Sequence, residues 1–195
     1  DFFSRTHDIE KMKTLLEKSL LRDLLKAYPD VDYLDQMDLI GVLLDIYNQK
    51  KEKKFIFIID EWDCIFREIK HDTRSQTLYL DFLRNLLKDK GYVALAYMTG
   101  ILPIKKYGTH SALNMFDEYS MTNPKQLAKY VGFTQAEVKT LCEQYQMDFE
   151  ESKRWYDGYR FQDGIQIYNP RSVVSAMLSK TFDNFWNQTE TFEAL

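Results

Sequence analysis

The chain has 195 residues, of which 45% are hydrophobic and 29% are charged, and its formal net charge is −4. This length and composition suit a globular protein with one domain, or with one core and an appendage. No apolar stretch reaches the roughly 18 residues of a membrane span, and the basic residues are dispersed. The sequence therefore predicts neither membrane insertion nor direct nucleic-acid binding. Two cysteines far apart in the sequence suggest neither a zinc cluster nor a disulfide framework, and favour a cytoplasmic location.

Two amphipathic helices are predicted in the first fifty residues. Apolar residues recur at steps of three and four from Ile9 to about Ala27, just before a proline. A second apolar stripe begins near Asp35 and continues to Tyr47. The lysine-rich run after it, which ends at Lys54, predicts a solvated turn.

Two apolar runs separated by a helical pattern predict a βαβ unit. The first, Phe55–Ile59, is typical of a strand buried on both faces of a parallel sheet. Thr73-x-x-Gln76 has the form of a capping box, and the helical pattern after it leads to the second run, Tyr92–Met98. Because the carboxyl ends of parallel strands meet at one edge of the sheet, we expect Asp60 and Thr99 to lie side by side.

The acids after the first run have the form of a Walker B motif, in which several hydrophobic residues precede Asp-Glu. In this interpretation Asp60 holds a hydrated Mg²⁺ ion on the phosphates of a nucleotide, and Glu61 orients or deprotonates an attacking water. The alternative is a core strand that ends in a solvated acidic turn. The motif by itself does not decide between the two.

The last third of the chain changes to short helices. Asn123-Pro124 predicts an N-cap followed by proline at the first helical position, and Thr134-x-x-Glu137 predicts a second capping box. Asp163-Gly164, between two short apolar runs, predicts a hairpin near residues 158–168. Asn169-Pro170 then begins another helix.

The predicted division of the chain lies at the end of Ile101–Thr122, a long segment without a clear period. We expect an α/β unit over residues 1–122. A mainly helical unit with a short hairpin is expected over residues 123–195.

Several stretches of the chain together resemble one family. They are Phe55–Asp63, Ala96–Ile101, Tyr130–Thr134 with Glu137-Val138, Trp155–Phe161, and Ile167–Pro170 with Ser172-Val173. In this order they resemble the predicted AAA-ATPase-like proteins of bacteria, which are P-loop ATPases often fused to a downstream nuclease domain of the restriction-endonuclease type. The Trp-Tyr-Asp-Gly-Tyr and Tyr-Asn-Pro pieces are more specific than the acidic strand end.

The resemblance implies roles for individual residues. Asp60 takes the metal-side position of Walker B, Glu61 the catalytic position, and Thr99 the position of the polar sensor of the γ-phosphate. Family members often carry arginine where this chain has Pro103. If that arginine contacts phosphate, Lys105 or Lys106 is the candidate to replace it. The alternatives are a capping hydroxyl for Thr99 and a solvated side chain for Lys105.

The resemblance also implies a partial P-loop NTPase-like parallel sheet core, followed by a helical lid. The 195 residues contain no Gly-x-x-x-x-Gly-Lys-Ser/Thr, and the first residue is not methionine. We therefore expect the phosphate-binding loop in a missing upstream segment, and we expect the isolated chain to bind ATP poorly. Apolar faces left by missing strands would be covered by a partner copy, by rearrangement or by upstream chain.

Different functions remain open on the sequence. The first is a fragment of an AAA-type ATPase that uses ATP and Mg²⁺ to regulate an attached nuclease or partner domain, with a homo-oligomer as one arrangement. The second is a catalytically inactive binding or scaffold module with the ATPase fold. A third, a metal-dependent nuclease that uses Asp60, Glu61 and Asp63, is disfavoured because Tyr92–Met98 offers neither an acid nor a lysine.

Overall fold

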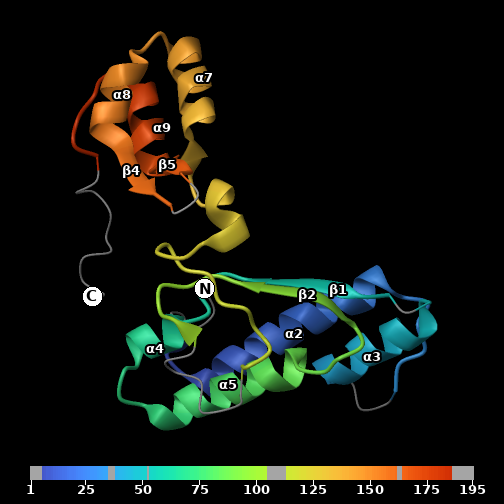
Figure 1. Cartoon of the computed structure of the whole chain (residues 1–195). Coiled ribbons are helices and arrows are strands. Elements are labelled where there is room, and N and C mark those ends of the chain that lie inside the picture. Colours follow the sequence, from blue (N-terminus) through green and yellow to red (C-terminus); the bar gives the residue numbers. More distant parts are fainter. Residues whose placement is uncertain (1–5, 35–37, 52, 105–112, 162–163, 186–195) are drawn as a thin grey trace. The chain divides into compact units, whose positions relative to one another are not determined.

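The computed structural model describes residues 6–34, 38–51, 53–104, 113–161 and 164–185. They form a mixed α/β structure that divides into two compact units, residues 1–116 and 117–195 (Figure 1). The division lies between Phe116 and Asp117, a few residues before the change of pattern at Asn123.

A two-stranded parallel sheet is the centre of the first unit. Strand β1 (Phe55–Ile59) pairs with β2 (Val93–Met98). Two helices lie between them in the sequence, α4 (Cys64–Glu68) and α5 (Thr73–Leu87). The predicted βαβ unit is therefore confirmed.

Three helices cover one face of this sheet, α2 (Ile9–Ala27), α3 (Leu39–Gln49) and α5 (Figure 1). Phe57 and Met98 of the sheet pack in one cluster with Leu43 of α3 and Leu87 of α5. Asp38 caps α3, so this helix starts later than the expected position near Asp35, which lies outside the described residues.

The prediction that β1 is buried on both faces is wrong. Side chains alternate along the strand, and Ile56 and Ile58 are 64% and 75% exposed. On β2, Leu95 and Tyr97 are 54% and 50% exposed. We call these four side chains the open face. An apolar run indicates a strand that can be buried, but its exposure depends on what packs against it, and the described helices of this unit pack on the other face.

Two helix starts differ from their predictions. The carboxylate of Asp72, and not Thr73, caps α5 by accepting a hydrogen bond of 3.0 Å from the N–H of Ser75. A carboxylate is the stronger acceptor and is favoured by the helix dipole. After Asn123-Pro124 the chain forms a 3₁₀ helix, Lys125–Tyr130, in which the proline is at the N-cap position.

In its described residues, the second unit combines this 3₁₀ helix and three α-helices with a three-stranded antiparallel sheet. The helices are α7 (Gln135–Tyr145), α8 (Phe149–Tyr156) and α9 (Pro170–Ser179). The strands, in spatial order, are β3 (Phe133–Thr134), β5 (Gln166–Tyr168) and β4 (Asp157–Arg160). Strands β4 and β5 confirm the predicted hairpin, whereas β3 was not predicted because two residues are too short for a periodic signal.

The predicted capping box at the start of α7 is confirmed and makes stability depend on pH. Glu137 accepts hydrogen bonds from the backbone N–H and the hydroxyl of Thr134, both at 2.8 Å. These bonds, the backbone one first, hold the pKa of Glu137 below its ordinary value. A carboxyl with a lowered pKa in the folded state stabilises the fold above its unfolded-state pKa. This contribution disappears as the pH falls through the folded-state pKa.

We therefore expect the stability of α7 to fall less steeply below about pH 5 in Glu137→Gln than in the wild type. The measurement is amide hydrogen exchange in α7 as a function of pH, with Glu143→Gln as the control. Glu143 is exposed on the same helix and lies outside the capping box. A Glu137→Gln profile as steep as that of the control would contradict the prediction.

Candidate functional site

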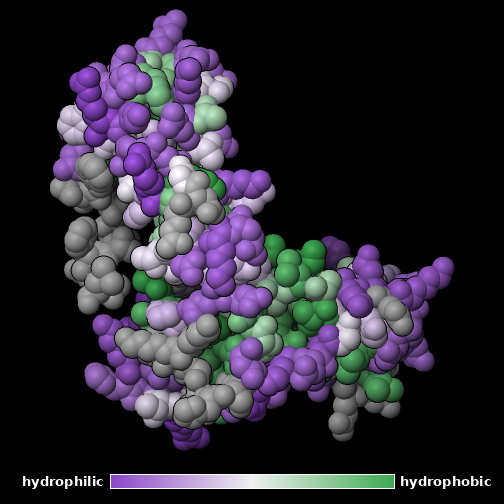
Figure 2. Space-filling model, in the orientation of Figure 1, coloured by the Kyte–Doolittle hydropathy of each residue, from purple (hydrophilic) through white to green (hydrophobic). Residues whose placement is uncertain are grey.

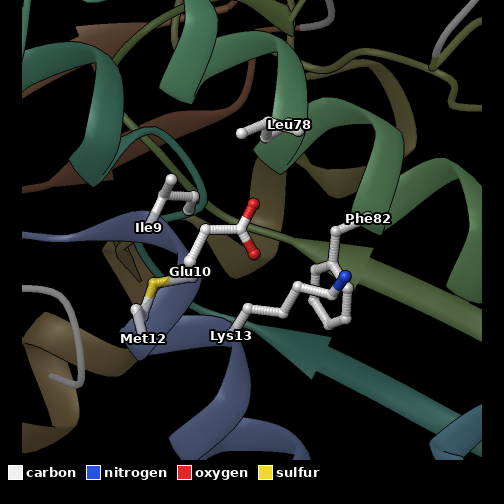
Figure 3. A pocket seen from close by; sticks show the side chains of 6 residues that line it. All are labelled: Ile9, Glu10, Met12, Lys13, Leu78 and Phe82. Atoms are coloured by element: carbon white, nitrogen blue, oxygen red, sulfur yellow. The ribbon is translucent and has the colours of Figure 1, made fainter.

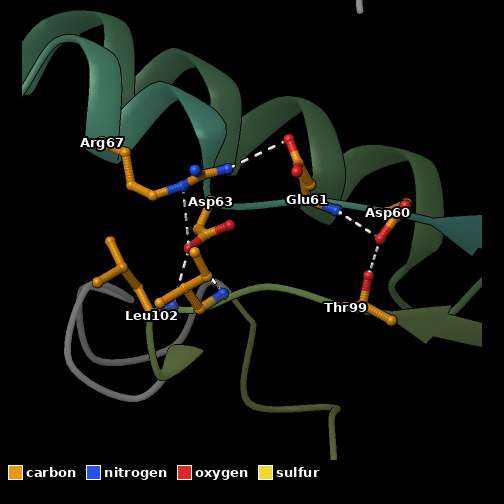
Figure 4. Close-up of polar contacts among 7 residues, drawn as sticks. Asp60, Glu61, Asp63, Arg67, Thr99 and Leu102 are labelled. Atoms are coloured by element: carbon orange, nitrogen blue, oxygen red, sulfur yellow. Dashed lines mark hydrogen bonds and ion pairs between the residues drawn. The ribbon is translucent and has the colours of Figure 1, made fainter. Parts of the chain in front are cut away.

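The carboxyl ends of β1 and β2 bring a carboxylate and a hydroxyl together, as predicted. The hydroxyl of Thr99 donates a hydrogen bond to Asp60 across the two strand ends (Figure 4). Strand pairing continues to this point, because the N–H of Thr99 donates to the carbonyl of Ile59 and the N–H of Trp62 donates to the carbonyl of Thr99, both at 2.9 Å. Asp60 is exposed and Thr99 is half-buried, so the pair is accessible at the edge of the sheet.

Glu61 follows Asp60 in the left-handed backbone region, with φ of 53°. This region costs a residue with a side chain about 1–2 kcal/mol, so the surrounding contacts must hold the turn in place. The N–H of Glu61 donates to Asp60 at 3.1 Å, and its carbonyl accepts from the N–H of Cys64 at 3.0 Å. The Glu61 carboxylate points away from Asp60 and pairs with Arg67, Nη2 to Oε2 3.3 Å (Figure 4).

A buried aspartate joins the two strand ends. Asp63 is 0% exposed, and its Oδ2 accepts hydrogen bonds from the N–H groups of Ile101 (3.0 Å) and Leu102 (2.8 Å), which follow β2. The Nε of Arg67 lies 3.5 Å from the same oxygen. This contact is an ion pair and not a hydrogen bond. Asp63 therefore fixes the turn after Thr99 relative to the turn after β1.

Gly100 lies where the two turns touch. A Cβ atom at this position would lie 2.6 Å from Cδ1 of Trp62 and 2.8 Å from Oδ1 of Asp63. Trp62 is 4% exposed and packs on Phe66, with ring centroids 5.4 Å apart. The close approach of the turns thus requires a residue without a side chain.

Of the predicted site residues, the structure brings the side chains of Asp60 and Thr99 together. Glu61 contacts Asp60 only through its backbone N–H, and Lys105 lies outside the described residues. The contribution of Arg67 was not predicted. Asp63 was considered only as a nuclease ligand, a role that does not fit a fully buried carboxylate bonded to two backbone N–H groups. Its position between tryptophan and an apolar run was the available signal, because an acid in such surroundings must be paired.

A cavity between α2 and α5 is far too small for a nucleotide. Its volume is about 20 Å³, which holds roughly one water molecule. Figure 3 shows the side chains that line it, Ile9, Glu10, Met12, Lys13, Leu78 and Phe82. We therefore keep the edge of the parallel sheet as the candidate site.

Other classes of site find no support in the described part of the chain. There, no three or more histidine, cysteine and acidic side chains converge on a point where they could hold a metal ion. Nor does any described helix combine the length and the apolarity needed to cross a membrane. Comparisons of the chain with family models, with curated proteins and with solved structures gave no match.

Proposed function

We propose that this chain supplies the Walker B half of the nucleotide site of an AAA-type ATPase, whose ATP binding and hydrolysis regulate an attached nuclease or partner domain. The hydrogen bond between Asp60 and Thr99, at the carboxyl edge of two adjacent parallel strands, carries this proposal. In open α/β sheets, ligands bind at this edge.

The side chains at the edge suit Mg²⁺ and phosphate. Asp60 is an exposed carboxylate, which is the kind of ligand that Mg²⁺ prefers, and it would hold the hydrated ion. When bound there, Mg²⁺ would neutralise charge on the phosphates. The Thr99 hydroxyl, which now donates to Asp60, donates instead to a phosphate oxygen or to the attacking water.

Glu61 is the proposed base, and its ion pair with Arg67 holds the carboxylate in its present position only weakly. The side chains of Glu61 and Arg67 are 64% and 27% exposed, so their ion pair contributes at most about 1 kcal/mol. Rotation of the Glu61 side chain breaks the pair and frees the carboxylate to orient a water molecule.

The residues present fit Mg²⁺ better than they fit a whole nucleotide. Backbone N–H groups and the lysine of a Gly-x-x-x-x-Gly-Lys loop supply much of the affinity for triphosphate, and the 195 residues contain no such motif. Within this proposal a segment outside these residues provides that loop. The 195-residue chain alone is therefore expected to bind Mg–ATP weakly.

The test is Glu61→Gln in the intact protein that contains this chain. We expect the variant to lose ATP hydrolysis by a factor of about 100 or more, because a positioned base contributes that much, and to keep its affinity for ATP. Glu68→Gln, which removes an exposed carboxylate at the end of α4, is the matched control and should keep the wild-type rate. Steady-state hydrolysis and equilibrium binding of Mg–ATP give both quantities.

Wild-type hydrolysis by Glu61→Gln would exclude Glu61 as the base. An intact protein that binds Mg–ATP without hydrolysing it would favour the inactive binding module. An intact protein that does not bind Mg–ATP at all would contradict the proposal as a whole.

A further inference from the structure

The four apolar side chains of the open face take no part in the proposed chemistry, although Asp60 at the end of the strand does. These four side chains are between half and three-quarters exposed. They form one patch, because Ile56 pairs with Leu95 and Ile58 pairs with Tyr97 across the two strands. Figure 2 shows apolar side chains gathered at the surface over β1 and β2. A contiguous patch of this kind indicates an interaction surface.

The row of β1 side chains on this face carries opposite charges at its two ends. Side chains of a strand alternate between faces. By extending this alternation one residue beyond each end of β1, we expect Lys54 and Asp60 to continue the row of Ile56 and Ile58. Both charged residues are exposed. Along the chain the row therefore runs basic, apolar, apolar, acidic. If the same row from a second copy is laid antiparallel on the first, each charged residue faces a residue of opposite charge.

We propose that the open face binds the open face of a second copy of this chain, with the two β1 strands antiparallel. A twofold axis perpendicular to the strands sets Lys54 of each copy opposite Asp60 of the other, and Ile56 opposite Ile58. The two faces are then self-complementary in charge as well as in apolar surface, as a twofold interface requires. Stacked sheets pack about 10 Å apart, which lets the apolar side chains of both copies interdigitate.

The area of the patch suits a weak dimer. Four side chains of this size and exposure present roughly 500 Å² per copy, so two facing copies bury on the order of 1,000 Å², close to the lower limit for a specific interface. We expect a dissociation constant in the micromolar range. An amphipathic helix would match the apolar centre of the face, but it would leave the opposite charges at the two ends of the row unexplained.

Sedimentation velocity of the 195-residue chain over about 5–200 μM at low ionic strength tests the proposal. The mass should rise with concentration from 23.3 kDa toward twice that value. Ile58→Glu should abolish association over this range, because it places a charge in the apolar centre. Leu178→Glu, at a 71% exposed leucine of α9, is the matched control and should dimerise like the wild type.

The two charged ends give an independent test that leaves the apolar centre intact. Lys54→Glu and Asp60→Lys should each weaken the dimer about tenfold, and the double variant should return to within about threefold of the wild type. Circular dichroism verifies that each variant is folded.

The proposal fails if the wild-type chain stays monomeric throughout the range, or if Ile58→Glu associates like the wild type. It also fails if exchange of the two charges does not restore the dimer. Growth into particles larger than a dimer would indicate pairing of the strand edges instead.

Discussion

Replacing Asp63 with alanine should lower the unfolding free energy of the first unit by about 3 kcal/mol. The substitution removes the acceptor of two backbone hydrogen bonds, from Ile101 and Leu102, and hydrogen bonds to a charged acceptor are worth about 1.5–3 kcal/mol each. It also removes the ion-pair partner of Arg67. Arg67 is 27% exposed and can regain water, so its loss of a partner costs less than an unpaired charge in the interior would. Urea unfolding measures the loss.

Two further variants show whether this loss comes from the bridge between the strand ends. Asp63→Asn keeps one acceptor oxygen and should lose about half as much stability as the alanine variant. Asp81→Ala breaks a surface ion pair with Arg84 in the same unit and should stay within about 0.5 kcal/mol of the wild type. Amide exchange at Ile101 and Leu102 should speed up most in the alanine variant, less in Asp63→Asn, and not in Asp81→Ala. An Asp63→Ala protein as stable as Asp81→Ala would contradict the bridging role.

Replacing Gly132 with alanine should destabilise the second unit by about 3 kcal/mol. The added Cβ would lie 2.4 Å from Cγ2 of Ile167 and 2.7 Å from the carbonyl oxygen of Tyr168. Both neighbours belong to β5 and are at most 1% exposed, so neither has room to move. Overpacking of this kind strains the backbone of a buried strand. Thermal unfolding and amide exchange in β5 measure the effect.

Gly158→Ala is the matched control for Gly132. The atom nearest to a Cβ at Gly158 is the carbonyl oxygen of Ile167, at 3.7 Å, which is an ordinary contact. We expect this variant to unfold like the wild type. The prediction is wrong if the two alanine variants lose the same stability, or if exchange in β5 is unchanged in Gly132→Ala.

The sequence by itself was sufficient for most of the local elements and for one long-range pair, although it misplaced the cap of α5 and did not indicate β3. The Thr134 capping box and the Asn169 cap of α9 depend on neighbouring residues, and both are present. The proximity of Asp60 and Thr99 could be predicted because parallel strands that are consecutive in a βαβ unit end at the same edge. Apolar periodicity and helix caps depend on residues a few positions apart, so they can be recognised in a single sequence.

Only the tertiary structure shows what packs against each face of the sheet and which groups each side chain contacts. An apolar run does not show which of its faces will be covered, and this is why Ile56 and Ile58 were expected to be buried. The pairing of Asp63 with Ile101 and Leu102 joins residues almost forty positions apart through backbone groups, which have no sequence signature. Burial and pairing are properties of neighbours brought together by folding. Burial and pairing at this site therefore follow only from the folded arrangement of the two strand ends and the helices packed on the sheet.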